Sequence, residues 1–259
     1  MLLEVSNLSV AFENDDGILV PAAENVSFTL DRGETLCLVG ESGSGKSTVA
    51  MSVPRLLPSP PSHLTGGSIK LDGTEITTLP VKELRHIRGA KIGVVFQDPM
   101  DSLSPLHNVG NQLMETVLLH RDISRKAARD MALDWLGRVG IPQPELRLKA
   151  LPHELSGGMR QRVMIAMALM LEPDLLIADE PTTALDVTVQ AQVLRLMKKL
   201  HSKNSGVLFI THDMGVVSQM ATKLCVMKSG KVVETSNDPA AFFTAPVHPY
   251  SKALLAAAS

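Results

Sequence analysis

Gly40-Glu41-Ser42-Gly43-Ser44-Gly45-Lys46-Ser47 is the stretch that decides the fold, because it matches the pattern G-x-x-x-x-G-K-S. The apolar run immediately before it, Thr35 to Val39 (TLCLV), predicts a short strand buried on both faces of a sheet. The residues that follow it, TVAMSV, are compatible with a helix. In this strand–loop–helix setting the glycines let the backbone curl, so that successive N–H groups and the helix start converge on phosphate oxygens. The stretch therefore predicts a nucleotide site, and its flanks weigh against a simple Gly-rich turn with an exposed lysine.

The side chains of this loop have separate expected roles. Lys46 is expected to reach the β- and γ-phosphates, and the hydroxyl of Ser47 is expected to ligate Mg²⁺. The predicted nucleotide-binding residues of the loop are Gly40, Ser42, Gly43, Ser44, Gly45, Lys46, Ser47 and Thr48.

An acid pair follows a second apolar run. Leu175 to Ala178 predicts a strand, and Asp179 and Glu180 come directly after it. Side chains alternate along a strand, so the two carboxylates are expected to point differently and to take different roles. Asp179 is the expected Mg²⁺ ligand, and Glu180 is the expected general base that polarises the attacking water. Acidic residues also favour helix N-caps, so the acid pair alone is a weak signal of a nucleotide site. It becomes a strong signal together with the loop at Gly40.

Three further residues complete the predicted site. Gln97 follows the run IGVVF and can offer its amide to Mg²⁺ or to the lytic water. His212 follows the run VLFIT and can hydrogen-bond the γ-phosphate and the water. Phe12 can stack on the base of the nucleotide, and a core aromatic is the alternative interpretation of the same residue.

The remaining pattern predicts an α/β chain with a mostly helical block between its strands. The other expected strands are Leu2 to Phe12, a run near Leu19, Val26 to Leu30, Ser68 to Leu71, Lys91 to Phe96, Val207 to Ile210 and Lys223 to Met227. The expected helices are Val109 to Leu119, Ser124 to Val139, Ser156 to Leu171 and Val187 to His201. Because helices separate the later strands, the central sheet is expected to be largely parallel.

Composition excludes several classes of protein. The net charge of −2 and the scattered basic residues give no bulk attraction to nucleic acid, so no nucleic-acid partner is expected. Cys37 and Cys225 lie far apart in apolar runs, which favours buried thiols over a disulfide or a zinc site. The longest strongly apolar stretch, Val163 to Leu171, is about half of what spans a bilayer. The start of the chain does not resemble a signal peptide, so work on a membrane is expected to go through partners.

Leu155-Ser156-Gly157-Gly158-Met159 opens a predicted helix shortly before the acid pair. This string resembles LSGGQ, the signature motif of ATP-binding-cassette (ABC) proteins, although Met159 departs from the usual glutamine. The order of the motifs is also that of the family: the loop at Gly40, then Gln97, the signature, the acid pair, Ala184-Leu185-Asp186 and finally His212.

The resemblance covers essentially the whole chain and implies the P-loop NTPase fold of ABC ATPases. That fold is α/β, with a mostly parallel core sheet, an N-terminal antiparallel β subdomain and an inserted α-helical subdomain, here about residues 97–171 of a single domain over 1–259. The implied cofactors are ATP and Mg²⁺. Two such subunits face head to tail, so that each ATP lies between one subunit's loop and Ser156, Gly157 and Gly158 of the other. Asp186 resembles the segment that crosses this dimer seam.

Finer strings narrow the branch of the family. DEPTTALDVTVQAQ from Asp179, ITHDMGVV from Ile210 and HPYSKALLAA from His248 closely resemble the oligopeptide, dipeptide and nickel importer branch. The last string belongs to a predicted C-terminal segment over about residues 238–259. The resemblance implies a peripheral subunit on the cytoplasmic face of the inner membrane, two integral membrane permease subunits and a substrate-binding protein. The second ATPase can be an identical copy, a paralogue or a fused half.

Several alternatives stay open from the sequence alone. Peptide is the first choice of cargo, and nickel or a metal chelate is the second. The end at Ser259 agrees with a short nickel-type subunit, with the first half of a fused ATPase, or with a shortened chain. A non-transport cassette ATPase for DNA repair or translation usually has a long coiled coil, a zinc insertion or a second cassette, and the sequence shows none of these. A nucleotide-binding regulator without turnover is disfavoured by Glu180 and His212.

Overall fold

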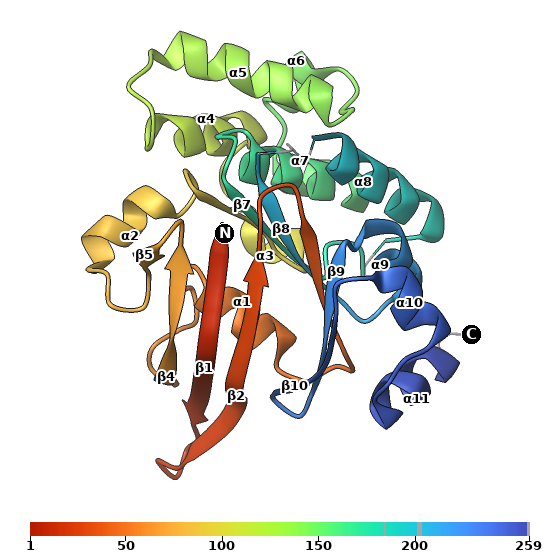
Figure 1. Ribbon diagram of the computed structural model, residues 1–259. Helices are drawn as coiled ribbons and strands as arrows, with labels where there is room; N and C mark the ends of the chain where they lie inside the picture. Colours follow the sequence, from red (N-terminus) through yellow and green to blue (C-terminus); the bar gives the residue numbers. More distant parts are fainter. Residues whose placement is uncertain (184, 201–203, 258–259) are drawn as a thin grey trace. The chain divides into compact units, whose positions relative to one another are not determined.

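The computed structural model describes residues 1–183, 185–200 and 204–257, and it divides the chain into two compact units. The first unit is Met1–Leu84 together with Ser202–Ser259, and the second unit is Arg85–His201. Helix α2 (Val81–Ile87) lies at the boundary between them. Both units contain strands and helices, so the α/β prediction is confirmed (Figure 1).

The first unit begins with an antiparallel sheet in the order β2-β1-β4-β5. Its strands are β1 (Leu3–Glu13), β2 (Leu19–Leu30), β4 (Ser62–Leu71) and β5 (Thr74–Glu75). The predicted strand over Leu2 to Phe12 is confirmed as β1, in which Leu3 and Val5, and then Leu8 and Val10 beyond a register shift, are buried. The separate strands expected near Leu19 and at Val26 to Leu30 are one continuous strand. Its pairing with β1 passes through several register shifts, and these irregularities break the period-two pattern that marks a strand in the sequence.

The first unit also contains the strands β10-β9-β3-β8 in that order. Strand β3 (Thr35–Val39) is buried along its whole length, as its apolar sequence predicts. It pairs in parallel with β8 (Gly206–Thr211) and β9 (Lys223–Lys228), whereas β10 (Lys231–Ser236) is antiparallel to β9. The helices of this unit are α1 (Lys46–Ser52), α9 (Met214–Met220), α10 (Pro239–Thr244) and α11 (Pro249–Ala257).

The second unit is mostly helical. Its strands β6 (Ile92–Val95) and β7 (Leu175–Asp179) pair in parallel. Its helices are α3 (Pro99–Ser102), α4 (Val109–Leu118), α5 (Arg125–Arg138), α6 (Pro144–Arg147), a 3₁₀ helix (Pro152–Glu154), α7 (Gly157–Leu169) and α8 (Val187–Leu200). Ser124 and Ser156 sit one residue before α5 and α7 as N-caps, because their hydroxyls accept from the amides of Ala127 and Met159. The predicted helices are therefore confirmed, although His201 lies outside the described residues.

Cys37 and Cys225 are both buried free thiols, as the sequence predicts. Cys37 lies directly opposite Leu224 in the parallel pairing of β3 with β9, whereas Cys225 lies opposite Leu38. Residues opposite each other share a face, so the two thiols point to opposite faces of the sheet. Burial raises the pKa of each thiol to about 12, which leaves both in the unreactive protonated form at neutral pH.

Among the helices formed by the described residues, none combines the length and the apolar character needed to span a bilayer.

Candidate nucleotide-binding site

The glycine-rich loop joins β3 to α1 in the first unit. Gly45 caps the helix with a left-handed backbone (φ +95°), and Lys46 is the first helical residue. Lys46 is 4% exposed, and its ammonium donates to the carbonyls of Gly40 and Glu41 at 2.8 Å each. The hydroxyl of Ser44 is buried and makes no hydrogen bond within the described residues. The loop thus gathers a cation, a hydroxyl and a helix start, which is the donor set that a phosphate needs.

Strand β9 and the turn after it hold this loop in place. Gly40 has φ +150°, and a Cβ built on it would lie 2.2 Å from the carbonyl oxygen of Met227. The amide of Gly230 donates to the carbonyl of Ser44 at 3.0 Å. Only glycine fits at position 40, because both its backbone conformation and the close approach of β9 exclude a side chain.

His212 emerges beside the start of the loop. Val39, the last residue of β3, pairs with Thr211, the last residue of β8. Because the two strands are parallel, Gly40 and His212 leave the sheet at the same edge. The structure thus brings the predicted γ-phosphate contact close to the predicted phosphate loop. His212 is exposed at this edge.

Phe12 lies near the end of β1, opposite Val20 on β2 and Ser62 on β4. Its side chain is half-buried, so it is not one of the fully buried core aromatics such as Phe209. Stacking of Phe12 on a nucleotide base stays a prediction.

The acid pair and Gln97 meet in the second unit. Asp179 is the last residue of β7 and is 7% exposed, and Glu180 follows it with a left-handed φ of +43°. The carboxylate oxygen Oε2 of Glu180 accepts a hydrogen bond from the Thr183 hydroxyl at 2.9 Å and a longer one from Gln97 Nε2 at 3.4 Å. The carboxylate of Asp179 is buried, whereas that of Glu180 is half-buried, so the two occupy different environments. The left-handed backbone of Glu180 separates them further than the alternation of side chains along a strand.

The two helix starts predicted to lie at a dimer seam are neighbours in the second unit. Ser156 is exposed and caps α7, with its hydroxyl 3.4 Å from the amide of Met159. Asp186 precedes α8, and its Oδ1 accepts from the amide of Val189 at 2.9 Å. A Cβ on Gly158 would lie 2.9 Å from Cγ1 of Val189, so Gly158 lies close against the start of α8. Ala184 lies outside the described residues.

The predicted site residues therefore fall into two groups. The phosphate loop, Phe12 and His212 belong to the first unit, and Gln97, Ser156, Gly157, Gly158, Asp179, Glu180 and Asp186 belong to the second. Sequence reasoning missed Thr183, which contacts Glu180. The hydroxyl-bearing string PTT directly after the acid pair was the available signal.

The predicted metal ligands suit a magnesium ion that is held mainly by phosphate and water. The described residues contain no cluster of three or more histidine, cysteine or acidic side chains that could hold a metal alone. Ser47, Gln97 and Asp179 supply oxygen atoms but a single carboxylate. Mg²⁺ typically takes one or two carboxylates and completes its shell with water and substrate phosphates.

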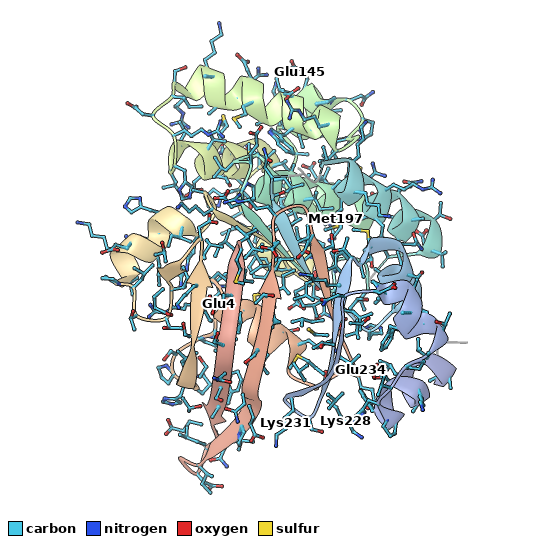
Figure 2. All side chains as sticks on the ribbon, viewed as in Figure 1. Glu4, Glu145, Met197, Lys228, Lys231 and Glu234 are labelled. Carbon is cyan, nitrogen blue, oxygen red and sulfur yellow. The ribbon has the colours of Figure 1, made fainter. Side chains whose placement is uncertain are left out.

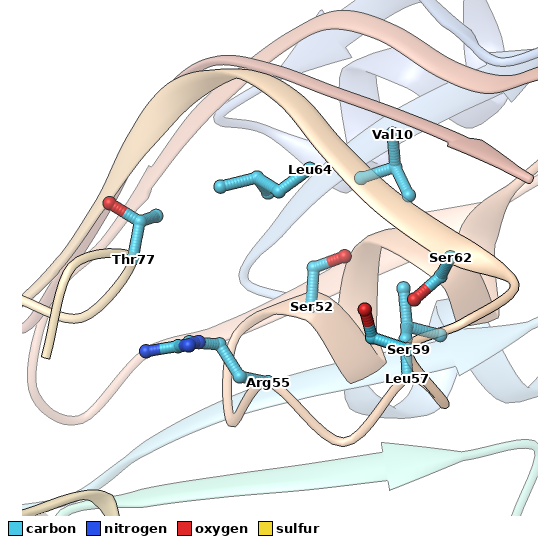
Figure 3. Close-up of a pocket in the computed structure, with 8 residues that line it drawn as sticks. All are labelled: Val10, Ser52, Arg55, Leu57, Ser59, Ser62, Leu64 and Thr77. Carbon is cyan, nitrogen blue, oxygen red and sulfur yellow. The ribbon is translucent and has the colours of Figure 1, made fainter. Parts of the chain in front are cut away.

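A pocket of about 190 Å³ lies elsewhere in the first unit (Figure 3). It is lined by residues around the C-terminal end of α1 and the strands β1 and β4: Val10, Ser52, Arg55, Leu57, Ser59, Ser62, Leu64 and Thr77. The guanidinium of Arg55 donates to the carbonyl of Leu79 at 2.6 Å. No predicted nucleotide-binding residue lines this pocket, so it is separate from the candidate site.

Comparison with known proteins agrees with this geometry. Residues 23–183 match the family described as ABC transporter, and the chain belongs to that family. Within it, the chain is an ATP-binding subunit that hydrolyses ATP to drive transport.

Individual relatives and structures cover nearly the whole chain. The chain is 50% identical to the oligopeptide transport ATP-binding protein OppD of Bacillus subtilis over 98% of its own length and 71% of that protein. It is 53% identical to the peptidoglycan transport ATP-binding protein YejF of Agrobacterium fabrum, over 99% of its own length but only 47% of that protein. The chain thus spans about half the length of some of its relatives. The ATP-binding cassette MJ0796, solved as a dimer in a post-hydrolysis state with ADP and Pi, superposes with a TM-score of 0.80 at 29% identity, over 91% of this chain and 98% of that one.

Proposed function

We propose that this chain is the ATPase motor of a peptide importer, and that it binds Mg·ATP with the loop at residues 40–48 and hydrolyses it with Glu180. The names of the oligopeptide transport protein OppD and of the dipeptide transport protein DppD of Bacillus subtilis, the latter 51% identical over 98% of this chain, support peptide as the cargo. No feature of the described residues favours nickel or a metal chelate over peptide.

The orientation of the Glu180 carboxylate carries the proposal. Thr183 and Gln97 both donate toward the same oxygen, Oε2, so that the carboxylate is held in one direction at the end of β7. A general base has to face the proton that it removes, and orientation therefore matters as much as its pKa. Asp179 and Ser47 would ligate Mg²⁺, which neutralises charge on the phosphates, with Gln97 as a further oxygen ligand. His212 would hydrogen-bond the γ-phosphate and the water.

The hydrogen bonds of Lys46 within the phosphate loop also support nucleotide binding. Lys46 is already directed at the interior of the loop, where it contacts the carbonyls of Gly40 and Glu41. An incoming triphosphate would exchange these neutral acceptors for charged oxygens, which form stronger hydrogen bonds with an ammonium. The buried hydroxyl of Ser44 would gain a partner in the same event.

We also propose a head-to-tail dimer in which Ser156, Gly157 and Gly158 of one cassette cap the ATP held by the other, with Asp186 at the seam. The exposed cap at Ser156 supports this, because its helix start faces solvent. The dimeric cassette MJ0796 supports the assembly by similarity. The second cassette can be an identical copy, a paralogue or a fused half.

The remaining partners follow from the same proposal. Two integral membrane permeases would dock on the segment from about Asp98 to Leu119, within the proposed helical subdomain over about residues 97–171. Leu106 and Leu119 are 84% and 72% exposed there, which supports a surface for an apolar partner. The subunit would sit peripherally on the cytoplasmic face of the inner membrane and receive peptide through a substrate-binding protein. Residues 1–259 would act as one nucleotide-binding domain that ends in a segment over about 238–259.

The test compares Glu180→Gln with the wild type in the assembled complex. Glu180→Gln should retain ATP binding, accumulate the closed dimer on size-exclusion chromatography and release phosphate at least about a hundredfold more slowly, because it loses its general base. Glu145→Gln is the matched control, since Glu145 is 74% exposed and pairs with Arg129 on the surface of the second unit. Phosphate release by Glu180→Gln at the wild-type rate would refute the role of Glu180.

A further inference from the structure

A buried tyrosine from the C-terminal helix contacts the phosphate loop. Tyr250 is the second residue of α11 and is 7% exposed. Its hydroxyl accepts a hydrogen bond from the backbone N–H of Glu41 at 3.0 Å. Tyr250 and Glu41 are far apart in the sequence but belong to the same unit, so this contact is part of one compact body.

The contact completes a clamp on a single peptide bond. The carbonyl of Gly40 and the N–H of Glu41 belong to the same peptide group, and in a trans peptide they point in opposite directions. Lys46 Nζ donates to that carbonyl at 2.8 Å, and Tyr250 accepts from that N–H. The plane of the Gly40–Glu41 peptide is therefore held from both sides. This plane sets the direction in which the loop leaves β3.

Tyr250 is itself supported by the end of β9. The ammonium of Lys228 lies 4.8 Å from the centroid of the Tyr250 ring, within the range of a cation–π interaction. The neighbouring residue Met227 places its carbonyl against Gly40. The same strand end thus supports both partners of the clamp, the ring and the loop.

A carboxylate on β10 anchors the segment that carries Tyr250. Glu234 accepts hydrogen bonds from the amides of Val247 at 2.9 Å and His248 at 2.8 Å, and the amide of Tyr250 donates to Nδ1 of His248 at 3.1 Å. Burial would raise the pKa of Glu234, but the Ser251 hydroxyl, these two amide hydrogen bonds and the nearby His248 outweigh it and lower the pKa. Glu234 is therefore charged at neutral pH, as a strong acceptor should be. Lys228 and Glu234 are labelled in Figure 2.

We infer that Tyr250 is a positioning residue for nucleotide binding, because it keeps the Gly40–Glu41 peptide in the orientation that the phosphate loop needs. This inference rests on the proposed function of the loop. When Lys46 turns from the carbonyl of Gly40 to the phosphates, Tyr250 continues to hold that peptide. The N–H of Glu41 donates to Tyr250, so this amide is reserved for the clamp. The histidine, proline and tyrosine at 248–250 thus connect to the nucleotide site through one hydroxyl.

The first test is Tyr250→Phe, which removes only the hydroxyl and keeps the ring over Lys228. Thr244→Val is the matched control, because it exchanges a hydroxyl for a methyl in the adjacent helix α10, where the Thr244 hydroxyl donates to carbonyls of its own helix. Fluorescence titration with a labelled ATP analogue should show about fivefold weaker binding for Tyr250→Phe, which corresponds to about 1 kcal/mol. The control should bind like the wild type.

Three outcomes of this titration have distinct meanings. A wild type that binds no nucleotide overturns the proposed function itself. A wild type that binds, together with a Tyr250→Phe variant that binds equally well, overturns the positioning role alone. A lower melting temperature without nucleotide, combined with unchanged affinity, also overturns it, because Tyr250 would then only anchor α11.

A second measurement needs no substitution. Tyr250 is the only tyrosine in the chain, so 3-fluorotyrosine incorporation gives a single fluorine resonance that reports on this position. Addition of Mg·ATP should shift this resonance, since the peptide that donates to the hydroxyl loses its contact with Lys46. A resonance that does not move at saturating nucleotide would overturn the inference even if Tyr250→Phe failed to fold.

Discussion

Replacement of Gly40 by alanine probes how tightly β9 holds the phosphate loop. The new Cβ would lie 2.2 Å from the carbonyl oxygen of Met227 and 2.9 Å from Oγ of Ser44, at a φ of +150°. The backbone conformation alone costs about 2 kcal/mol for a residue with a Cβ. The clash adds about 2 kcal/mol, because Met227 contributes backbone that cannot rotate away. The expected loss is about 4 kcal/mol of unfolding free energy, or roughly 10 °C in Tm for a chain of this size.

Gly43→Ala is the matched control in the same loop. Gly43 also has a left-handed φ of +77°, but a Cβ built on it meets no atom within 4 Å. Only the conformational cost applies there, about 1 kcal/mol. Thermal unfolding of both variants by circular dichroism, without nucleotide, gives the comparison. Equal losses in the two variants would refute the claim that β9 excludes a side chain at position 40.

Two further predictions concern buried and hydrogen-bonded groups. Cys37 and Cys225 should resist a soluble maleimide at pH 8 in the folded protein and react fully in denaturant, because burial raises the pKa of both thiols to about 12. Mass spectrometry measures the labelling, and rapid labelling of the native chain would contradict this prediction. Burial would raise the pKa of Glu75, but hydrogen bonds from the Ser68 and Thr77 hydroxyls and from two amides outweigh it and lower the pKa from 4.5 to about 2. Because the folded-state pKa is depressed, the stabilisation is complete above the unfolded value and is lost as the pH falls from 4.5 toward 2. Glu75→Gln should therefore cost about 1 kcal/mol at pH 7 and much less at pH 2, as measured by urea unfolding, and a cost independent of pH would contradict the assignment.

The strands and helices that the sequence predicted best were those with a strong local signal. β3 was predicted with its observed bounds, because a short apolar run directly before a glycine-rich phosphate loop is typical of a buried parallel strand. Ser124 and Ser156 marked helix starts correctly, because an N-cap is a local hydrogen bond. The division of β2 into two strands was wrong, because its register shifts depend on pairing with β1, which a local pattern does not reveal.

In the candidate site, too, the local motifs were predicted and the contacts between distant parts of the chain were not. The motifs placed Gly40 and His212 directly after predicted strands. Because β3 and β8 are parallel neighbours, these two residues lie at the same edge of the sheet. The link from Tyr250 to Glu41 was not predictable, because it joins residues 209 positions apart through a single hydroxyl. Thr183 was missed for a related reason: the string PTT places a hydroxyl after the acid pair, but the residue types do not predict the left-handed backbone of Glu180 or the hydrogen bond that Thr183 donates to it.

The most direct test of the candidate nucleotide site is the equilibrium binding of Mg·ATP to the purified chain, compared with binding to Lys46→Ala. Lys46 is the buried cation of the loop, and its ammonium lies within hydrogen-bonding distance of the loop backbone on which the phosphates are expected to sit. We expect saturable binding by the wild type and its loss in the variant, with an unchanged circular dichroism spectrum. Equal binding by a folded Lys46→Ala variant, or no binding by the wild type, would contradict the assignment of residues 40–48 as the nucleotide site.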